Sequence, residues 1–408
     1  MRPTPALLAH TQAVLARLLE FSAPADQTLS GYFRGHRAMG QRDRAFVAET
    51  AYAVLRRKRS LEAAAGSGTP RDLITAALVR VFGHSGRALG LDADLATKLR
   101  APVSALSGAV QAELPDWLWE RLTVQQGATE AAAIARGLLA PAPLDLRVNL
   151  AKRSRDEVLS DLRLEASATP LSPAGIRLAG KPAVNRHPLF LDGSVEVQDE
   201  GSQLLAYLLA PRRGEMVADF CAGAGGKTLA IAMQMRGTGR VYAMDVSAKR
   251  LAALAPRAAR AGVSNIHSLV LADENDLRAR RLAGKLDRVL VDAPCSGFGT
   301  LRRNPDLKWR YGPERVAALA EQQLSILCAA ARLVKPGGRL VYATCSILSE
   351  ENEAVVGRFL ERTPDFEALS CADLLAQQRI ALDTGRELRL WPHRHGTDGF
   401  FATAFARR

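Results

Sequence analysis

The sequence predicts an α/β fold in its C-terminal half, preceded by an all-α region and a small α+β segment. From Gln198 onward, apolar runs typical of buried strands alternate with amphipathic helical stretches, which implies a mostly parallel sheet covered on both faces. Before Ala140 the apolar residues recur only at helical spacing, with Gly and Pro breakers between the pieces. We therefore expect three domains, at 1–140, 141–197 and 198–408.

The elements of the C-terminal half follow from short apolar runs. Strands are predicted at 216–220, 240–244, 268–271, 288–291, 339–343 and 400–405, the last at the sheet edge. Helices are predicted at 248–261 and along a face from Val316 to Val334. In the connecting segment the pattern predicts a strand at 144–150, a helix at 153–164, and a strand and turn at 189–193.

Composition restricts the class of protein. The 408 residues carry a net charge of +13, which favours a polyanionic partner such as RNA. The five cysteines include no C-x-x-C pair, so the usual spacing of a zinc site is missing. Their odd number argues against a disulfide framework and for a reducing cytosol. No apolar run resembles a signal peptide or a membrane span. We expect a soluble, monomeric, cytoplasmic protein without a metal.

Basic residues gather at two places in the helical region. One is the run 56–59, and the other combines aromatic and basic side chains at Tyr32, Phe33, Arg34, His36, Arg37, Arg42 and Arg44. Such clusters either form a solvated helix face or contact phosphates and bases of RNA, and the sequence leaves both readings open.

A glycine-rich loop lies between the first strand and the first helix of the α/β region. It comprises Cys221, Ala222, Gly223, Ala224, Gly225, Gly226, Lys227 and Thr228. A P-loop requires glycine where Cys221 stands, and the dinucleotide fingerprint requires glycine where Thr228 stands. S-adenosylmethionine has no phosphate and needs no strict phosphate cradle, so it is the cofactor that this loop favours.

Acidic residues close the strands that follow. Asp245 can accept hydrogen bonds from both ribose hydroxyls of the cofactor, and Asp273 is placed to reach its adenine. Asp292 ends the fourth strand. Because ligands in such sheets bind beyond the carboxyl ends of the strands, the glycine loop and these three residues together predict one site.

Two cysteines occupy similar positions at strand ends. Cys295 follows the run 289–291, and Cys345 follows 340–343. Free cysteines are usually small core residues, but two thiols beside a glycine loop favour covalent chemistry, with one to attack and one to assist. Cys221 belongs to the cofactor loop, and neither it nor Cys328 nor Cys371 receives a catalytic role.

Five segments carry a resemblance to the RsmB/NOP/sun family of RNA cytosine-5 methyltransferases. They are 198–203, 292–297, 302–306, 342–346 and 398–401, and the residues at 41–45 and 54–56 are similar to the NusB-like helical domain of the bacterial 16S rRNA members. The sequence departs from the family at Ala224, where proline is usual, and at Glu274. The resemblance implies a Rossmann-like class I methyltransferase domain that uses S-adenosyl-L-methionine, behind an RNA-binding NusB-like domain.

The resemblance also implies roles for individual residues. Cys345 is the nucleophile toward carbon 6 of cytosine, Cys295 assists its release, and Asp292 hydrogen-bonds ring nitrogen 3. Lys227 either reaches the base or the cofactor carboxylate, or is a cation at the surface of a helix start. The implied substrate is 16S rRNA, with transfer RNA or a non-catalytic RNA-binding assembly factor as the alternatives.

Overall fold

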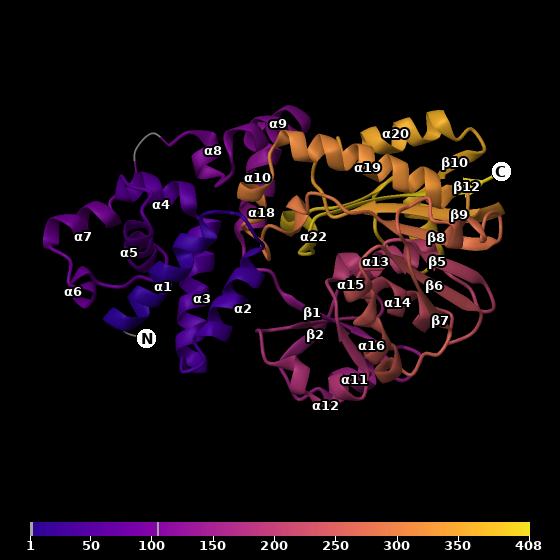
Figure 1. Cartoon of the computed structure of the whole chain (residues 1–408), viewed down its shortest axis with the longest axis horizontal. Helices are drawn as coiled ribbons and strands as arrows, with labels where there is room; N and C mark the ends of the chain where they lie inside the picture. Colours follow the sequence, from indigo (N-terminus) through magenta and orange to yellow (C-terminus); the bar gives the residue numbers. More distant parts are fainter. Residues whose placement is uncertain (1–2, 104–105) are drawn as a thin grey trace. The chain divides into compact units, whose positions relative to one another are not determined.

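The computed structural model describes residues 3–103 and 106–408, which form two compact units (Figure 1). The helical unit contains Met1–Pro141 and Thr300–Pro313, and the α/β unit contains Ala142–Gly299 and Glu314–Arg408. The position of residues 300–313 in the sequence predicts that they belong to the C-terminal domain. They belong instead to the helical unit.

The helical unit consists of short helices around a leucine-rich core, as the apolar spacing predicts. Helix α1 begins at Pro5 because the side chain of Thr4 caps it, and Thr69 does the same for α5. Val14, Leu15, Val47 and other apolar side chains of α1–α7 form the core. The helices are α1 (Pro5–Leu18), α2 (Ala25–Gly35), α3 (Gln41–Arg56), α4 (Lys58–Ala65), α5 (Pro70–Arg80), α6 (Gly86–Leu89), α7 (Ala93–Arg100), α8 (Gly108–Gln111), α9 (Asp116–Gln126) and α10 (Ala128–Leu139).

The inserted segment of the helical unit carries one further helix, α18 (Leu307–Arg310). The indole Nε1 of Trp309 donates a 2.8 Å hydrogen bond to the backbone oxygen of Leu55. The carboxylate of Asp306 accepts a 3.2 Å bond from the backbone N–H of Ala25. These bonds satisfy polar groups at the end of α3 and the start of α2, so the segment completes the helical unit.

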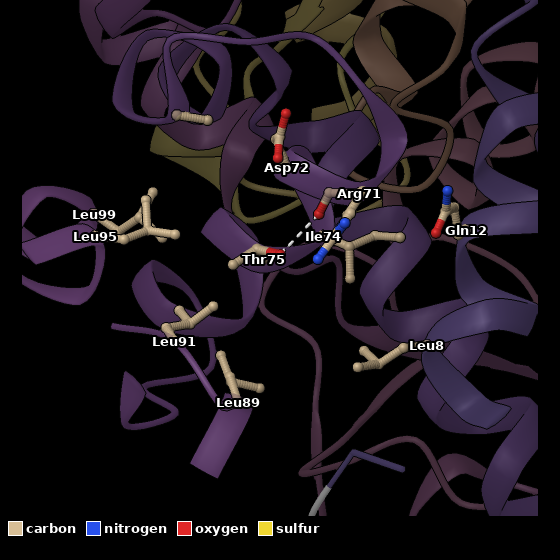
Figure 2. A pocket seen from close by; sticks show the side chains of 11 residues that line it. Leu8, Gln12, Arg71, Asp72, Ile74, Thr75, Leu89, Leu91, Leu95 and Leu99 are labelled. Carbon is tan, nitrogen blue, oxygen red and sulfur yellow. Dashed lines mark hydrogen bonds between the residues drawn. The ribbon is translucent and has the colours of Figure 1, made fainter. Parts of the chain in front are cut away.

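A pocket of about 270 Å³ lies inside the helical unit, lined mainly by residues of α1, α5, α6 and α7, with Ala65 of α4. Figure 2 shows Leu89, Leu91, Leu95 and Leu99 on one side of it, with Thr75 bonded to the backbone of its own helix. This lining is mostly aliphatic, with Gln12, Arg71, Asp72 and Thr75 as its polar members.

The α/β unit begins with a four-stranded antiparallel sheet in the order β2-β3-β1-β4. Residues 189–193, predicted as a strand and turn, include the end of the short helix α12, because His187 caps it and Pro188 starts it. A short apolar run does not distinguish a strand from a helix by periodicity alone. The elements are β1 (Leu144–Val148), α11 (Arg155–Asp161), β2 (Ala166–Ala168), β3 (Gly175–Leu178), η1 (Val184–Arg186), α12 (Pro188–Leu191) and β4 (Val195–Val197).

The second sheet has the order β10-β12-β9-β8-β5-β6-β7, with β11 paired to β12. Strands β5 to β9 are parallel, and β10, β11 and β12 run antiparallel to their neighbours. The predicted edge position of the last strand is wrong, because β12 lies between β9 and β10. The strands are β5 (Met216–Asp219), β6 (Arg240–Asp245), β7 (Ile266–Val270), β8 (Leu286–Asp292), β9 (Val334–Thr344), β10 (Phe366–Leu369), β11 (Leu388–Leu390) and β12 (Phe400–Arg407).

Helices cover both faces of this sheet, as expected for parallel strands (Figure 1). Val289 and Val291 of β8 pack in the core beneath α19 and α20, and Leu290 packs in the core on the α13 and α14 side. This is a Rossmann-like α/β fold. The helices are α13 (Glu200–Leu209), α14 (Gly226–Gln234), α15 (Ala248–Ala252), α16 (Leu254–Ala261), α17 (Leu277–Arg280), α19 (Pro313–Ala331), α20 (Glu353–Arg362), α21 (Cys371–Gln377) and α22 (Pro392–His395), with the turn η2 (Phe298–Thr300).

Membrane-spanning helices and metal-binding clusters are both missing from the part of the chain that the structure describes. Within 3–103 and 106–408, no helix is both long and apolar enough to cross a bilayer. The same residues contain no cluster of three or more His, Cys, Asp and Glu side chains suited to a metal ion.

Candidate functional site

The strand order reverses between β5 and β8, and a cavity of about 470 Å³ opens at the carboxyl ends of these strands. A small-molecule site is expected at such a reversal, and the volume falls in the usual range for one. The predicted residues that line the cavity are Cys221, Ala222, Gly223, Ala224, Asp245, Asp292, Cys295 and Cys345. One cavity thus brings together the glycine loop, two of the three acids and both cysteines.

The glycine loop is tightly folded over the start of α14. Gly225 adopts a φ of +85°, and a Cβ there would lie 2.2 Å from Cδ1 of Leu254. Only glycine fits a left-handed position packed this closely. Gly225, Gly226 and Lys227 therefore shape the turn and the helix start, and do not line the cavity themselves.

Asp245 ends β6 and faces the glycine loop. One carboxylate oxygen accepts a 2.8 Å bond from the backbone N–H of Gly223, and the other accepts a 2.7 Å bond from that of Ser247. The guanidinium of Arg250, whose side chain is 60% exposed, also donates to both oxygens. An exposed guanidinium can move aside, so Asp245 suits the ribose hydroxyls expected here.

We expect Asp245→Ala to weaken binding of S-adenosylmethionine. The ribose hydroxyls lose an ionised acceptor, which costs about 1.5–3 kcal/mol, or roughly a 10- to 150-fold loss of affinity. Titration calorimetry measures this directly. Glu321→Ala, which removes an exposed carboxylate paired with Arg358 on α19 and α20, is the control and should bind normally. Unchanged affinity of the Asp245 variant would place the ribose elsewhere.

Asp273 does not line the cavity, whereas the next residue, Glu274, does. The carboxylate of Asp273 accepts a 2.7 Å bond from the backbone N–H of Asn275, which is a turn within its own loop. Its predicted contact with adenine stays a prediction. Arg250, Gln322 and Ile326 also line the cavity without having been assigned a role, because nothing in their local sequence marks residues of α15 or α19 as cavity residues.

Lys227 and Asp292 form an ion pair, with Nζ 2.6 Å from a carboxylate oxygen. The reading of Lys227 as a surface cation is wrong, since its side chain is only 14% exposed. Burial alone lowers the pKa of Lys227, but the charge and hydrogen bond of Asp292 outweigh it and raise the pKa overall. The lysine thus stays charged and holds the carboxylate of Asp292 at the cavity.

Cys295 and Cys345 meet at the edge of the cavity, with their sulfurs 3.3 Å apart. The hydrogen bond with Cys345 and burial raise the pKa of Cys295 well above its ordinary value. Cys295 is therefore a protonated thiol at neutral pH and can donate a hydrogen bond to the sulfur of Cys345. This pairing agrees with one attacking and one assisting thiol.

Close backbone packing fixes the loops around the cysteines. The backbone N–H of Gly299 donates to the oxygen of Cys345, and that of Gly399 donates to the oxygen of Gly299, both at 2.8 Å. A Cβ on Gly299 would lie 2.2 Å from the oxygen of Gly399. The Asp398-Gly399 segment thus supports the loop that carries Cys345, a role that its sequence alone does not indicate.

In the helical unit, several predicted RNA-contacting residues have structural contacts. Tyr32 is buried and cannot stack on a base. Arg56 donates to the backbone oxygen of Arg302, and Arg59 pairs with Asp116 at 2.7 Å. The exposed basic side chains of the two clusters are Arg34, Arg37, Arg42 and Arg57.

Comparison with known families gives two matches along the chain. Residues 206–406 match the family described as 16S rRNA methyltransferase RsmB/F, and residues 114–185 match the RsmF/B-like ferredoxin-like domain. The ribosomal RNA small subunit methyltransferase B of Erwinia tasmaniensis is 31% identical over 97% of this chain and 98% of its own length. The protein of that name from Shewanella oneidensis is 36% identical over 74% and 68%. A Synechocystis relative is 39% identical over 71% of this chain and 66% of its own length.

Solved structures agree with this result. PH0851 superposes with a TM-score of 0.77 at 26% identity, covering all of both chains. A methyltransferase homologue from Pyrococcus horikoshii gives 0.64 at 28% identity, covering 76% of this chain and all of its own. The chain belongs to the RsmB/F family, and it is an S-adenosylmethionine-dependent RNA methyltransferase.

Proposed function

We propose that this enzyme methylates carbon 5 of a cytidine in 16S rRNA through a covalent bond to Cys345. The observation that carries the proposal is the 3.3 Å contact between the sulfurs of Cys345 and Cys295 at the edge of the cofactor cavity. Two adjacent thiols supply a nucleophile and a proton donor at one point, which suits addition to a pyrimidine ring followed by elimination.

Carbon 5 of cytosine is a poor nucleophile until carbon 6 has been attacked. The Cys345 thiolate adds to carbon 6, and the ring becomes an enamine whose carbon 5 attacks an electrophilic methyl group. Bound S-adenosylmethionine supplies that methyl. A base then removes the proton from carbon 5, and elimination returns the bonding electrons to the sulfur of Cys345.

Two further residues act on the ring and the leaving thiolate. Ring nitrogen 3 takes up a proton as the thiolate adds to carbon 6, and the carboxylate of Asp292, held by Lys227, accepts a hydrogen bond from that protonated nitrogen and so stabilises the adduct. Cys295 has its proton beside the sulfur of Cys345, where it assists departure of that sulfur. Both roles use groups that line the same cavity.

The rRNA substrate is supported by the names of the relatives and by the net charge of +13. Such a substrate places the protein in the cytoplasm. Bisulfite mapping of total RNA from cells with and without the gene tests the proposal. We expect a single 16S rRNA cytidine to lose its protection in the deletion strain. If instead a transfer RNA cytidine lost its protection from bisulfite conversion, the substrate would be transfer RNA. Identical bisulfite maps in the two strains would contradict cytosine-5 methylation.

We further propose that the helical unit is an RNA-binding, NusB-like domain, in which the exposed Arg37, just before α3, and Arg42, in its first turn, contact phosphate groups of the RNA. The double variant Arg37→Glu/Arg42→Glu should weaken RNA binding and flatten its salt dependence. The slope of log affinity against log salt concentration is negative, and each lost phosphate contact reduces its magnitude by about 0.7–0.9. Fluorescence anisotropy across a salt series measures the slope. Arg87→Glu, an exposed arginine on α6, is the matched control. An unchanged slope would remove these arginines from the interface.

A further inference from the structure

One buried carboxylate joins the two loops that carry the catalytic thiols. Glu351 lies just before α20 and is fully buried. Its Oε2 accepts hydrogen bonds from the hydroxyls of Ser296, at 2.5 Å, and Ser346. Its Oε1 accepts a 2.7 Å bond from the backbone N–H of Ser296. These serines directly follow Cys295 and Cys345, so a single side chain is bonded to both cysteine loops.

Neighbouring side chains fix this carboxylate in place. The amide of Gln323 on α19 donates to Oε1 at 3.0 Å and to the backbone oxygen of Pro294 at 2.9 Å. The hydroxyl of Tyr342 on β9 donates to the backbone oxygen of Glu351 at 2.6 Å. The side chain of Glu351 is thus held by a residue of α19, and its backbone is held by a residue of β9 in the central sheet.

Burying the carboxylate of Glu351 has a cost in free energy, which indicates that its hydrogen bonds have a purpose. The four donors to the carboxylate of Glu351 are neutral groups. A buried carboxylate loses its hydration, and neutral donors offset this cost only when their geometry is good. An aliphatic side chain would fill the same space without that cost, but the loops would keep only their direct bonds, such as the 3.2 Å contact between the hydroxyls of Ser296 and Ser346. We therefore attribute the hydrogen bonds of Glu351 to fixing the positions of the two cysteine loops.

We propose that Glu351 is a positioning residue, which holds the sulfurs of Cys295 and Cys345 in contact by binding the serine that follows each. The inference rests on the proposed function for its catalytic consequence. Displacement of a reacting group by about 1 Å can cost on the order of 100-fold in rate. The carboxylate itself touches neither the cofactor cavity nor the reacting atoms, because it acts through Ser296 and Ser346.

The test compares Glu351→Ala with Glu351→Gln in the full-length enzyme. The glutamine oxygen can accept the two bonds made to Oε1, and its NH₂ group can donate to both serine hydroxyls, which accept as well as donate. We expect Glu351→Ala to lower kcat about 100-fold at unchanged KM for RNA. Glu351→Gln should retain most of the wild-type kcat. Glu350→Ala removes the neighbouring carboxylate and should behave as wild type.

A second readout follows the sulfurs without using activity. Diamide takes two electrons and two protons from Cys295 and Cys345, becoming a hydrazine as the disulfide forms, and peptide mapping gives the rate. Loosened loops should slow this reaction about tenfold in Glu351→Ala, but not in Glu351→Gln. The readout is independent of the proposed function, which fails separately if Cys345→Ala still methylates RNA.

Each outcome decides the proposal. A wild-type diamide rate in Glu351→Ala would overturn it, even if kcat fell, because the sulfurs would then be in place. A loss in Glu351→Gln as large as in Glu351→Ala would also overturn it, since charge rather than position would matter. Unchanged binding of S-adenosylmethionine confirms that the variant is folded. If it does not fold, Ser296→Ala/Ser346→Ala gives the same two readouts, and wild-type values in both would contradict the proposal.

Discussion

Cys345→Ala should abolish both RNA methylation and the covalent capture of RNA. Without a sulfur at this position no group adds to carbon 6 of cytosine, and carbon 5 does not become nucleophilic. Loss of the nucleophile in an enzyme of covalent mechanism costs about 10⁴-fold or more in kcat. Transfer of a labelled methyl group to unmodified 16S rRNA measures turnover, and a denaturing gel detects the adduct.

The control for this experiment is Cys328→Ala. Cys328 lies on α19, outside the cofactor cavity, and carries no proposed role. Its replacement should leave methylation and the adduct unchanged. Binding of S-adenosylmethionine should hold in both variants, because the glycine loop and Asp245 are unaltered. Turnover by Cys345→Ala within a few-fold of wild type would show that the nucleophile is another group.

Much of the cavity could be predicted because its determinants are local in sequence. An apolar run followed by a turn marks the carboxyl end of a parallel strand, and all such ends meet at one edge of the sheet. That rule alone predicts that Asp245, Asp292, Cys295 and Cys345 lie together, and all four line the cavity. Asp273 shows the limit of this rule, because the rule predicts where a strand ends but not in which direction a side chain points.

Features that depend on distant contacts could not be predicted. Residues 300–313 follow the Cys295 loop in sequence, yet Trp309 and Asp306 bond to helices of the N-terminal region. No periodicity in the sequence of residues 300–313 predicts that they contact the N-terminal helices. Glu351 presents the same difficulty, since an acid before a helix usually caps it at the surface. Its burial depends on Ser296 and Gln323, which come from separate elements.

Cys295→Ala should leave Cys345 able to attack but slow to depart. The thiol that donates to the sulfur of Cys345 is then missing, so elimination lacks its assisting group while addition and methyl transfer proceed. A covalent adduct between protein and RNA should accumulate and persist on a denaturing gel, and turnover should fall about 10²- to 10⁴-fold, the usual contribution of acid–base assistance.

The double variant Cys295→Ala/Cys345→Ala separates this adduct from any other cross-link. It should give no adduct, because the sulfur that bonds to RNA is absent. Mass spectrometry of the trapped complex should place a methylated cytidine on Cys345. An adduct that forms in Cys345→Ala and is absent in Cys295→Ala would exchange the two roles.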